Sequence, residues 1–564
     1  MYNVKRIIDR WSEKMTRISR SELLEKVKKR VLASLPQDHS QKIAFVSVGF
    51  LNKRAFVWQT RHENSNRIWT KIERHIDRYY NVSPWIKIDV VDSVRTMSYE
   101  ELQQQFSTIE RNNYFRYGIA FDNRFEVAFL EQEINANEIL KPGPNYRISQ
   151  LGNVDLHFDF NNLNKYIFEK YKRPLFLKEE MLHSKVLHIF TTKSFLIEES
   201  GTLVDLQKRE LYNGIRFING KNEKKLLTHI VEEGGKFLVN QLSNDGKFVY
   251  GYFPCYDRTL TSYNTIRHFS SLYALLEVLE YTKDFSMVKK IKSSIDWGIK
   301  HLSKLVDNQR FFFESTNREI KLGAQGMALL ALSKYMSITG SREYESSCLQ
   351  VVSALERMVD KAGNTVHVLD GETLQVVEEF RTVYYDGEAV FGLMRLYTLV
   401  QDKHILELAQ RIFDRLIEKK YWKYHDHWLS YAANEITYYI NCPDYFDFGI
   451  RNAFEHLEFI DKRETAYPTL LELMNSAHLL IEKCKKEHPE LLEKYDVEKF
   501  EKIRTKRARH EITGVFLPEI AMYFKNPQKI QYGFYSRHDR FRTRIDDAEH
   551  FLSGFINYLK NPQN

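Results

Sequence analysis

Cysteine is scarce in this chain, and its four cysteines form no recognisable pair. Cys255, Cys348, Cys442 and Cys484 include no CxxC motif, so neither a zinc ribbon nor a disulfide framework is indicated. Few and scattered cysteines fit a reducing compartment, and we expect a cytoplasmic protein.

Long apolar runs and nucleotide-binding motifs are also missing. No window approaches eighteen apolar residues, so we expect no membrane span. The first twenty residues have no apolar core segment and include Asp9 and Glu13, so we expect neither a signal peptide nor a transit peptide. The N-terminal third has no phosphate loop, no GxGxxG and no histidine cluster with metal spacing.

Net charge is small for a chain of this size. Lysine and arginine number 83 against 75 acidic residues, which gives +8. This balance permits an anionic partner without requiring one, and no nucleic acid is expected. The densest basic run is KFEKIRTKRARH, residues 499–510, which we interpret as a solvated helix face, with contact to an anionic polymer as the alternative.

Residues 1–220 mix strand and helix patterns without a regular βαβ period. Alternating apolar runs predict strands at 42–50, 54–60, 85–94, 117–122, 125–130, 154–158 and 186–191. Helices are predicted at 1–35, 66–80 and 100–110, so we expect an α+β accessory domain of unknown role. Its one polar concentration, Glu131, Glu133 and Asn135, is interpreted as a solvated turn. Residues 203–222 are largely polar and predict a linker.

After residue 221 the pattern changes to pairs of helices with a hidden repeat. Six apolar helices end in similar turns at Asp284, Gly340, Asp402, Asp461, Asn526 and Asn561, at intervals of 56, 62, 59, 65 and 35 residues. They begin near Tyr263, Gly323, Gly387, Phe448, Glu511 and Asp547. Because a helix that is apolar all round must be buried all round, we predict six inner helices. Amphipathic segments 227–242, 286–305, 342–360, 404–420 and 467–486 predict outer partners, and the short last interval makes the sixth unit atypical.

This alternation resembles the (α/α)6 toroid superfamily, which includes glycoside hydrolases, polysaccharide lyases, sugar epimerases, lanthionine cyclases and terpenoid or prenyl transferases. The resemblance covers about residues 225–564 and is architectural, and a shared fold does not fix a function. The fold class is therefore expected to be mainly α, with a toroid at 221–564 preceded by the α+β domain.

In a toroid the inner helices begin at a common opening, so polar residues at their starts are the site candidates. The predicted substrate-binding residues are Tyr263, Asn264, Arg267, Tyr385, Asp447, Arg451, His510, Arg544 and Asp547. The predicted catalytic residues are His268, Asp386, Glu388, Asp546 and His550. Asp386, Asp444 and Asp546 have a plain alternative as helix N-caps, a position that aspartate favours.

Two groups carry most of the chemical argument. Asp546 and Asp547 stand four and three residues before His550, so a carboxylate can orient its imidazole as a general base requires. A buried ion pair that closes the ring is the structural alternative. Asp386 and Glu388 are the best carboxylates for acid–base work, and glycoside cleavage requires two across the bond.

Metal binding is weakly indicated. Cys255 and Cys442 precede the first and fourth predicted inner helices, but the Cys-His dipeptide of lanthionine cyclases is missing, and we expect no metal or other cofactor. The aspartate-rich motifs of terpenoid cyclases are also missing.

The resemblance and the polar openings together favour a carbohydrate-active enzyme. We expect a hydrolase, lyase or epimerase acting on a sugar or oligosaccharide with an anionic group, in glycan or polysaccharide synthesis or tailoring, with the arginines holding the anion. One alternative is a non-catalytic toroid that holds a ligand or peptide for a partner enzyme. Another is a peptide- or isoprenoid-modifying enzyme.

Overall fold

The computed structural model describes residues 20–37, 41–110, 113–143, 153–208 and 212–562. The chain divides into two compact units, each built from separate parts of the sequence. Unit 1 comprises residues 1–217, 254–256 and 516–531, and unit 2 comprises residues 218–253, 257–515 and 532–564. Among the described residues, no helix is both long and apolar enough to cross a membrane.

Unit 1 is organised by an antiparallel sheet with strand order β2-β1-β3-β8-β4-β5, to which β9 adds beside β8. Its strands are β1 Lys42–Val48, β2 Phe56–His62, β3 Trp85–Met97, β4 Gly118–Ala120, β5 Ala128–Phe129, β8 Leu187–Glu198 and β9 Leu203–Asp205. A separate pair consists of β6 Leu140–Pro142 and β7 Leu156–Phe158. These strands lie where the alternating runs predict them, except β6, which no predicted run covers, and β9, which falls inside the predicted linker.

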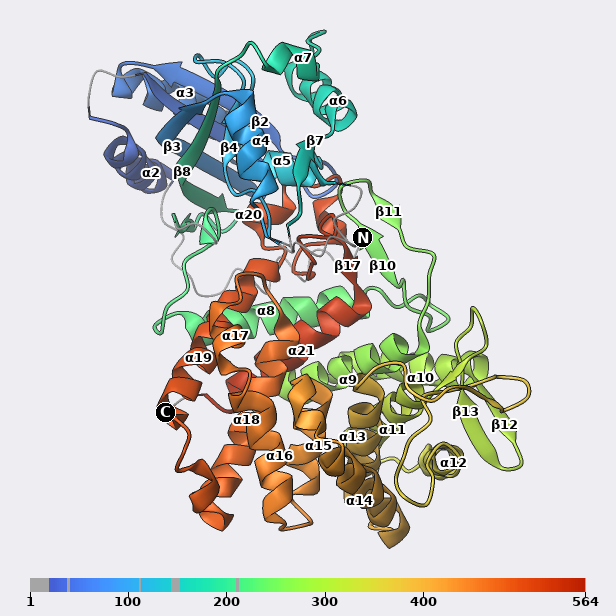
Figure 1. The fold of residues 1–564 in the computed structure, drawn as a ribbon. Coiled ribbons are helices and arrows are strands. Elements are labelled where there is room, and N and C mark those ends of the chain that lie inside the picture. The colour runs from blue at the N-terminus through green and yellow to red at the C-terminus, as the bar shows by residue number, and fades with distance from the viewer. Residues whose placement is uncertain (1–19, 38–40, 111–112, 144–152, 209–211, 563–564) are drawn as a thin grey trace. The chain divides into compact units, whose positions relative to one another are not determined.

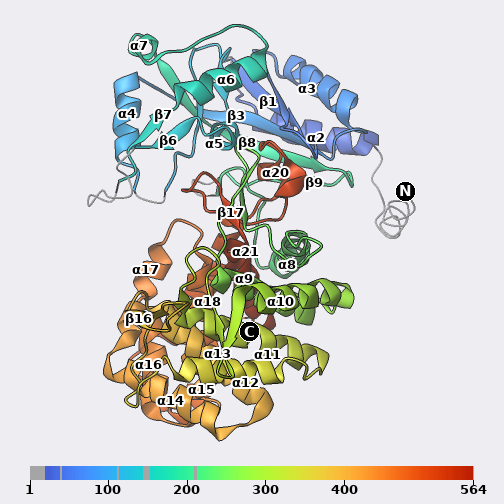
Figure 2. The ribbon, with the colours of Figure 1, turned by 90° about the vertical axis from the view of Figure 1, so that its right-hand side faces the viewer.

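Helices cover the sheet through two apolar clusters. The helices of unit 1 are α2 Arg20–Ser34, α3 Ser65–Tyr79, α4 Tyr99–Ser107, α5 Glu131–Ala136, α6 Phe160–Tyr171, α7 Glu179–Leu182 and α20 Pro518–Ala521, with the 3-10 turn η6 Pro527–Lys529. One cluster joins α2 and α3 to β1 and β3, and the other joins α4 and α6 to β4 and β8 (Figure 2). Side-chain caps start three of these helices, since Asn64 accepts from the amide of Arg67, Ser98 from that of Glu101 and Asp159 from that of Asn162.

Helix α5 corrects the prediction of a solvated turn. Its six residues are all buried. Glu133 accepts hydrogen bonds from the Tyr166 hydroxyl at 2.6 Å and the Lys170 ammonium at 2.7 Å. Buried carboxylates are tolerated when they are paired in this way, so a run of acidic letters here marks a core and not a surface.

A late segment of the chain completes unit 1. Within residues 516–531, the carbonyl of Met522 accepts from the amide of Ala55 at 2.7 Å. Glu519 is fully buried and receives Arg216 in a two-point ion pair, from Nε at 2.9 Å and Nη2 at 2.7 Å. The unit therefore depends on contacts between residues about 300 positions apart.

Unit 2 is a closed ring of six inner helices, in which each contacts the next and the last contacts the first (Figure 1). In ring order they are α9 Thr265–Thr282, α11 Leu322–Thr339, α13 Tyr384–Val400, α15 His427–Ile436, α18 Pro468–Glu487 and α21 Ile545–Lys560. The outer layer consists of α8 Glu223–Val239, α10 Val288–Leu302, α12 Glu345–Glu356, α14 Lys403–Glu418, α16 Pro443–Phe454 and α19 Val497–His510. This arrangement is an (α/α)6 toroid.

Short elements connect the helices. The strands are β10 Gly251–Phe253, β11 Arg258–Thr259, β12 Ser303–Val306, β13 Gln309–Phe312, β14 Ile320–Lys321, β15 Val368–Leu369, β16 Val376–Glu378 and β17 Thr543–Arg544. The remaining turns are η2 Phe285–Met287, η3 Tyr421–Tyr424, η4 Pro489–Leu492, η5 Glu511–Gly514 and the short helix α17 Leu457–Lys462. β14 and β17 run directly into α11 and α21, so they fix where those inner helices begin.

Four of the six predicted inner helices are correct, and two are wrong. The predicted fourth begins near Phe448, which lies on the outer helix α16, and the predicted fifth begins near Glu511, just after the outer helix α19. α16 is apolar because α14, α15, α18 and two turns cover it. α18 was predicted to be outer because it carries polar residues, yet these are buried in the ring.

The basic run 499–510 is only partly a solvated face. It forms most of α19, in which Arg504 and Arg507 are buried. Arg507 pairs with Glu511 at 2.6 Å and Arg504 with Glu501 at 2.8 Å. These arginines are engaged within the toroid.

Glycines let α11 and α13 approach until their backbones touch. A Cβ on Gly326 would lie 2.3 Å from the carbonyl oxygen of Glu388, and one on Gly392 would lie 2.3 Å from that of Gly326. A Cβ on Gly323 would lie 1.8 Å from Oε2 of Glu388. Only glycine fits at these three positions, and Glu388 is therefore held against α11.

Candidate active site

A cluster of ionisable side chains lies on five of the inner helices, most of them near the helix starts and Glu277 farther along α9. The cluster draws on α9, α13, α15, α18 and α21, and its members are Arg267, Glu277, Glu388, Asp426, His427, Glu472, Arg544, Asp546, Asp547, Glu549 and His550. Most of these side chains are buried. A buried charge is costly unless it is paired, so each of these side chains is expected to have a partner or a function.

His427 is held as a base by the residue before it. Asp426 caps α15 by accepting the amide of Leu429 at 3.2 Å through Oδ1. Its Oδ2 lies 3.1 Å from Nδ1 of His427. A carboxylate only accepts, so Nδ1 carries the proton and Nε2 presents a lone pair. Nε2 of His427 is buried and has no hydrogen-bond partner.

His550 faces His427 and is held in a similar way. The two ring centroids are 5.1 Å apart, with the planes at 78°. Nδ1 of His550 lies 2.8 Å from Oε2 of Glu472 and 3.3 Å from Oε1 of Glu549. Burial raises the pKa of Glu472 to about 8, and that of Glu549 also rises because of burial. Glu472 therefore retains its proton at neutral pH.

Arg267 brings a cation to the same region. Its Nε lies 2.8 Å from Oδ2 of Asp546, and its guanidinium donates to the Tyr250 hydroxyl. Arg544 donates to the same Oδ2 at 2.7 Å, while Oδ1 of Asp546 is buried without a hydrogen-bond partner. Burial, with the neighbouring charge of Asp546, raises the pKa of Asp547 to about 6.

Glu388 is a buried acid with no cation in direct contact. Burial raises its pKa to about 8, the charges of Asp426 and Asp386 raise it further, and that of Arg267 lowers it. Its Oε2 has no hydrogen-bond partner. At neutral pH this side chain is therefore a protonated carboxyl that can donate a hydrogen bond.

Aromatic side chains surround the two histidines. Trp428 lies 4.8 Å from the His427 ring and 6.3 Å from the His550 ring. Tyr431 stacks on Phe391 at 4.9 Å and donates from its hydroxyl to Glu472 at 3.2 Å. These rings limit water near the imidazoles.

The same cluster contains the one group of described residues that could hold a metal ion. One ligand atom from each of His427, Glu472 and His550 lies within 4.8 Å of the others. A divalent ion there would replace the hydrogen bond between His550 and Glu472. No cysteine belongs to this group. Cys255 lies in unit 1, and Cys442 is the N-cap residue of α16.

Six of the residues that the sequence predicts lie in the cluster, namely Arg267, Glu388, Arg544, Asp546, Asp547 and His550. His268 points the other way, toward α10. Its ring lies 2.9 Å from the Tyr263 hydroxyl and 3.1 Å from the Ser294 carbonyl, and burial lowers its pKa to about 3. Both ring nitrogens are occupied, so we leave His268 and Tyr263 out of the proposed site.

The other predicted residues also face away from the cluster or lie outside the inner ring. Asp386 accepts from Thr365 at 2.5 Å and lies 3.1 Å from Nε2 of His367. Asn264 is the N-cap of α9, and Tyr385 packs beside Gly323 and His367.

Three predicted residues belong to outer helices, so their assignment to the starts of inner helices is wrong. Asp447 and Arg451 lie on α16, where Arg451 pairs with Glu455 at 2.8 Å. His510 is the last residue of α19 and lies 2.7 Å from the carbonyl of Glu464.

Five members of the cluster were not predicted from the sequence, namely Glu277, Asp426, His427, Glu472 and Glu549. Asp426 and His427 carry a usable signal, an Asp-His pair at the start of an apolar segment, HDHWLSYAA. Glu472 has no such signal, because a single acid on a helix resembles any exposed glutamate.

No family model and no curated protein matches this sequence. Solved structures do match about three fifths of the chain. A D-mannose isomerase is 11% identical with a TM-score of 0.48, covering 61% of this chain and 99% of its own. A cellobiose 2-epimerase from Bacillus thermoamylovorans B4167 is 11% identical with a TM-score of 0.46, over 60% and 99%. An alpha-1,6-mannanase from Salegentibacter sp. HEL1_6 is 12% identical with a TM-score of 0.42, over 59% and 98%.

Likeness at this level of identity bears on the fold alone. The closed ring of six inner helices with six outer partners is found in the chain's own contacts. The predicted resemblance to the (α/α)6 toroid superfamily is confirmed.

Proposed function

We propose that unit 2 is a sugar isomerase or epimerase that moves a proton at the carbon beside a carbonyl group. The facing pair of His427 and His550 carries this proposal. Each imidazole has Nδ1 against a carboxyl group, which leaves both Nε2 atoms for a substrate. Such anchoring fixes the ring orientation that general acid–base catalysis needs.

The proposed step uses the two rings as base and acid. Nε2 of His427 removes the proton from the substrate carbon, and the electron pair of that C–H bond forms a C=C bond while the carbonyl oxygen becomes negative. Return of a proton from the His550 side to the opposite face gives the epimer. Return of a proton to the former carbonyl carbon, with the hydroxyl proton of the neighbouring carbon passing to the former carbonyl oxygen, gives the isomeric ketose. The proton that Glu472 retains, 2.8 Å from Nδ1 of His550, supplies the acid form.

Arg267 is the proposed partner of the developing oxygen charge. It reaches the cluster from the start of α9 and is fixed by Asp546 and Tyr250. A preorganised guanidinium stabilises an oxyanion without reorganising during the reaction. The protonated Glu388 is a second donor close to the same charges.

Charge in the cluster favours a neutral sugar over the anionic one predicted from the sequence. Carboxylates outnumber arginines even when Glu388, Glu472 and Glu549, whose pKa values burial raises, are set aside, since Glu277, Asp426, Asp546 and Asp547 stand against Arg267 and Arg544. Both arginines already pair with Asp546. Carboxyl groups accept hydrogen bonds from hydroxyls and repel an added anion, so a polyol fits better than a uronic acid.

Hydrolysis has less support from the geometry. It needs an ionised carboxylate opposite a protonated one. Asp386 is engaged by Thr365 and His367, and Asp426 is engaged by the α15 cap and His427. These carboxylates hold other groups in place instead of facing a glycosidic bond.

Proton exchange in heavy water tests the proposal. Full-length protein is incubated with D-mannose, D-glucose or cellobiose in D2O, and proton NMR follows loss of the C2 proton and appearance of the epimer or ketose. His427→Gln and His550→Gln are each expected to slow exchange by roughly 100-fold or more with an unchanged melting temperature. His404→Gln, an exposed histidine on α14, is the matched control.

Two outcomes contradict the proposal. One is wild-type exchange in both histidine variants. The other is a cleaved glycosidic bond with no deuterium at C2. Loss of exchange after treatment with a chelator, restored by a divalent metal, would replace the acid–base pair with a metal site at His427, Glu472 and His550.

A further inference from the structure

A groove in unit 1 follows the edge strand of its sheet. Among the described residues, β2 ends the strand order and pairs with β1 alone. The groove is lined by five consecutive residues of β2, 57–61, so it runs along this strand instead of crossing it. Residues 124–126 form a second wall, and a third is formed by Lys170 and Tyr171 at the end of α6 and by Arg173 just after it. The volume of about 480 Å³ lies within the range of ligand sites.

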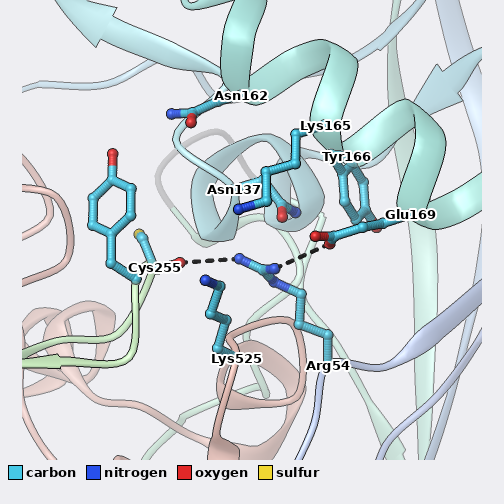
Figure 3. Close-up of a pocket in the computed structure, with 9 residues that line it drawn as sticks. Arg54, Asn137, Asn162, Lys165, Tyr166, Glu169, Cys255 and Lys525 are labelled. Atoms are coloured by element: carbon cyan, nitrogen blue, oxygen red, sulfur yellow. Dashed lines mark hydrogen bonds and ion pairs between the residues drawn. The ribbon is translucent and has the colours of Figure 1, made fainter.

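A smaller hollow in the same unit, beside Arg54, is not a comparable site (Figure 3). Its volume of about 20 Å³ is room for little more than one water molecule. Nη2 of Arg54 donates to the carbonyls of Ala136 at 3.2 Å and Cys255 at 3.1 Å, and Nη1 donates to Glu169 at 3.3 Å. This guanidinium is therefore engaged within the fold, and the larger groove is the candidate binding site.

The outer edge of β2 has backbone groups that no other strand uses. Among the described residues, no backbone hydrogen bond joins β2 to any segment other than β1. Every second residue of an antiparallel edge strand directs its N–H and C=O away from the sheet. In this seven-residue strand about three residues do so. Near one end, the carbonyl of Arg61 accepts from Nζ of Lys71 at 3.2 Å, and the rest of the edge can receive an extended segment.

The wall formed by residues 124–126 is held rigidly by one aspartate. Oδ1 of Asp122 accepts from the amides of Arg124 and Glu126, each at 2.9 Å. Its Oδ2 accepts from the amide of Val127 at 2.9 Å, and the ring of Phe125 is buried. A wall that is already ordered loses little conformational entropy when a ligand binds beside it.

A side chain, and not a backbone ladder, connects β2 to this wall. Nε2 of Gln59 donates to the carbonyls of Phe125 at 2.8 Å and Glu126 at 2.9 Å. Val57 lies two residues from Gln59, so both side chains share one face of the strand, and Val57 is buried. The bridge therefore leaves the strand backbone free and has apolar surface beside it.

The groove has an excess of positive charge. Its lining has four cationic residues and one acid. Two of the cations are neutralised, Arg61 by Glu126 at 3.1 Å and Lys170 by a buried glutamate at 2.7 Å. Arg124 and Arg173 are exposed, and neither forms an ion pair with an acid among the described residues. This balance attracts an acidic segment and repels a basic one.

We propose that this groove binds an extended acidic peptide segment of a partner protein, which adds to the sheet as a strand beside β2. The peptide backbone pairs with the outer edge of β2, and this pairing supplies affinity. Carboxylates of the peptide meet Arg124 and Arg173, and these contacts select an acidic sequence. Residues 57–61 extend over about 13 Å, so about five residues of the partner are engaged.

The edge strand favours a peptide over an anionic polysaccharide. A sugar chain would satisfy the two arginines, but it has no backbone N–H and C=O groups at the spacing of a β-ladder. The groove shares no residue with the proposed acid–base cluster, so failure of either proposal leaves the other standing.

Fluorescence anisotropy with the full-length protein tests this site. The test ligand is a fluorescein-labelled heptapeptide of alternating glutamate and valine with blocked ends, and protein is added up to about 300 μM in about 50 mM salt. We expect saturable binding that weakens as the salt concentration rises. A heptapeptide of alternating lysine and valine should not bind.

Backbone pairing is tested with the same acidic peptide N-methylated at every amide, which can donate no backbone hydrogen bond. This peptide should not bind, although its charge is unchanged. Equal binding of the methylated peptide would overturn the proposal, because it would show that charge alone is recognised. Saturable binding of an oligogalacturonate without binding of the acidic peptide would overturn it in favour of an anionic polysaccharide.

Hydrogen exchange and paired variants locate the bound peptide. Amides within residues 56–62 should exchange more slowly when the acidic peptide is bound. Arg124→Gln with Arg173→Gln is expected to bind roughly 10-fold more weakly at an unchanged melting temperature, because two exposed ion pairs are lost. Arg74→Gln with Lys178→Gln removes the same charge from exposed positions of unit 1 outside the groove and should bind as wild type. Absence of saturable binding, unchanged exchange in β2, or equal affinity of the two double variants overturns the proposal.

Discussion

Glutamine at position 388 keeps the shape of the side chain and removes its ionisation. Glu388 is fully buried, and its pKa rises from 4.5 to about 8 because burial and the charge of Asp426 oppose the carboxylate. The folded protein therefore holds this proton to a pH near 8, while the unfolded chain releases it near 4.5. The free energy of unfolding falls as pH rises between these values, and the variant lacks this contribution.

The size of the effect follows from the shift. Each pKa unit corresponds to about 1.4 kcal/mol, so the full difference is on the order of 5 kcal/mol above pH 8. Unit 2 has roughly 330 residues, for which the unfolding entropy is about 0.7 kcal/mol per degree, so the gain is about 7 °C. At pH 5 both side chains are neutral, and wild type and variant should melt within about 1 °C of each other.

Differential scanning calorimetry at pH 5, 6, 7, 8 and 9 measures this difference in paired buffers. Other buried carboxyls titrate in both proteins, so only the variant minus wild-type value is informative. Glu407→Gln, an exposed glutamate on α14, should show no pH-dependent difference. A gap between Glu388→Gln and wild type that stays constant from pH 5 to 9 would refute the argument, because it would show that Glu388 ionises normally.

Three further predictions concern other buried groups. Glu519→Ala leaves Arg216 without its two-point partner, and a loss of about 3 to 5 kcal/mol should appear as an earlier urea transition of unit 1. His268→Leu should keep full sugar turnover in the exchange assay. Between pH 7 and 5, the free energy of unfolding of the wild type should fall by about 2 kcal/mol relative to that of this variant. The reason is that the buried ring, with a pKa of about 3, stays neutral in the folded protein, while the same ring takes up a proton near pH 6.5 in the unfolded chain. Turnover should fall as pH rises above about 8, where Glu472 beside His550 loses its proton, and a rate that is flat to pH 10 would contradict the acid role.

Local pattern was sufficient for most elements of the fold. Apolar residues on every side predict α9, α11, α13 and α21, because burial of a helix in a ring is recorded in its own composition. Alternation likewise places β1, β2 and β3. These features depend on neighbours a few residues apart.

The pattern failed where a helix in one layer has the composition of the other. α18 carries Glu472, Asn475 and Ser476, which face the ring interior, and polar residues on one side of a helix indicate solvent unless the partners are known. α16 is apolar although it is an outer helix, because adjoining turns cover it. Because α16 was assigned to the inner layer and α18 to the outer layer, the predicted site included Asp447 and Arg451.

The sequence predicted that the site lies at the starts of the inner helices, but not which side chains pair with one another there. His550 was found through Asp546 and Asp547, yet its carboxylate partners are Glu472 and the adjacent Glu549. Its opposing imidazole lies 123 positions away in the sequence. Such pairs form only when the ring closes, so local sequence patterns cannot predict them.

The interleaving of the two units constrains how the chain is made. A ribosome releases residues 1–217 long before residues 516–531. The α+β unit is therefore incomplete until almost the whole chain has been synthesised, because Glu519, the partner of Arg216, lies in that late segment. During that interval Arg216 lacks its partner Glu519, and the amide of Ala55 lacks the carbonyl of Met522. Nascent chains stalled before residue 516 should therefore be cut readily by protease within residues 1–217, and those stalled well past 531 should resist.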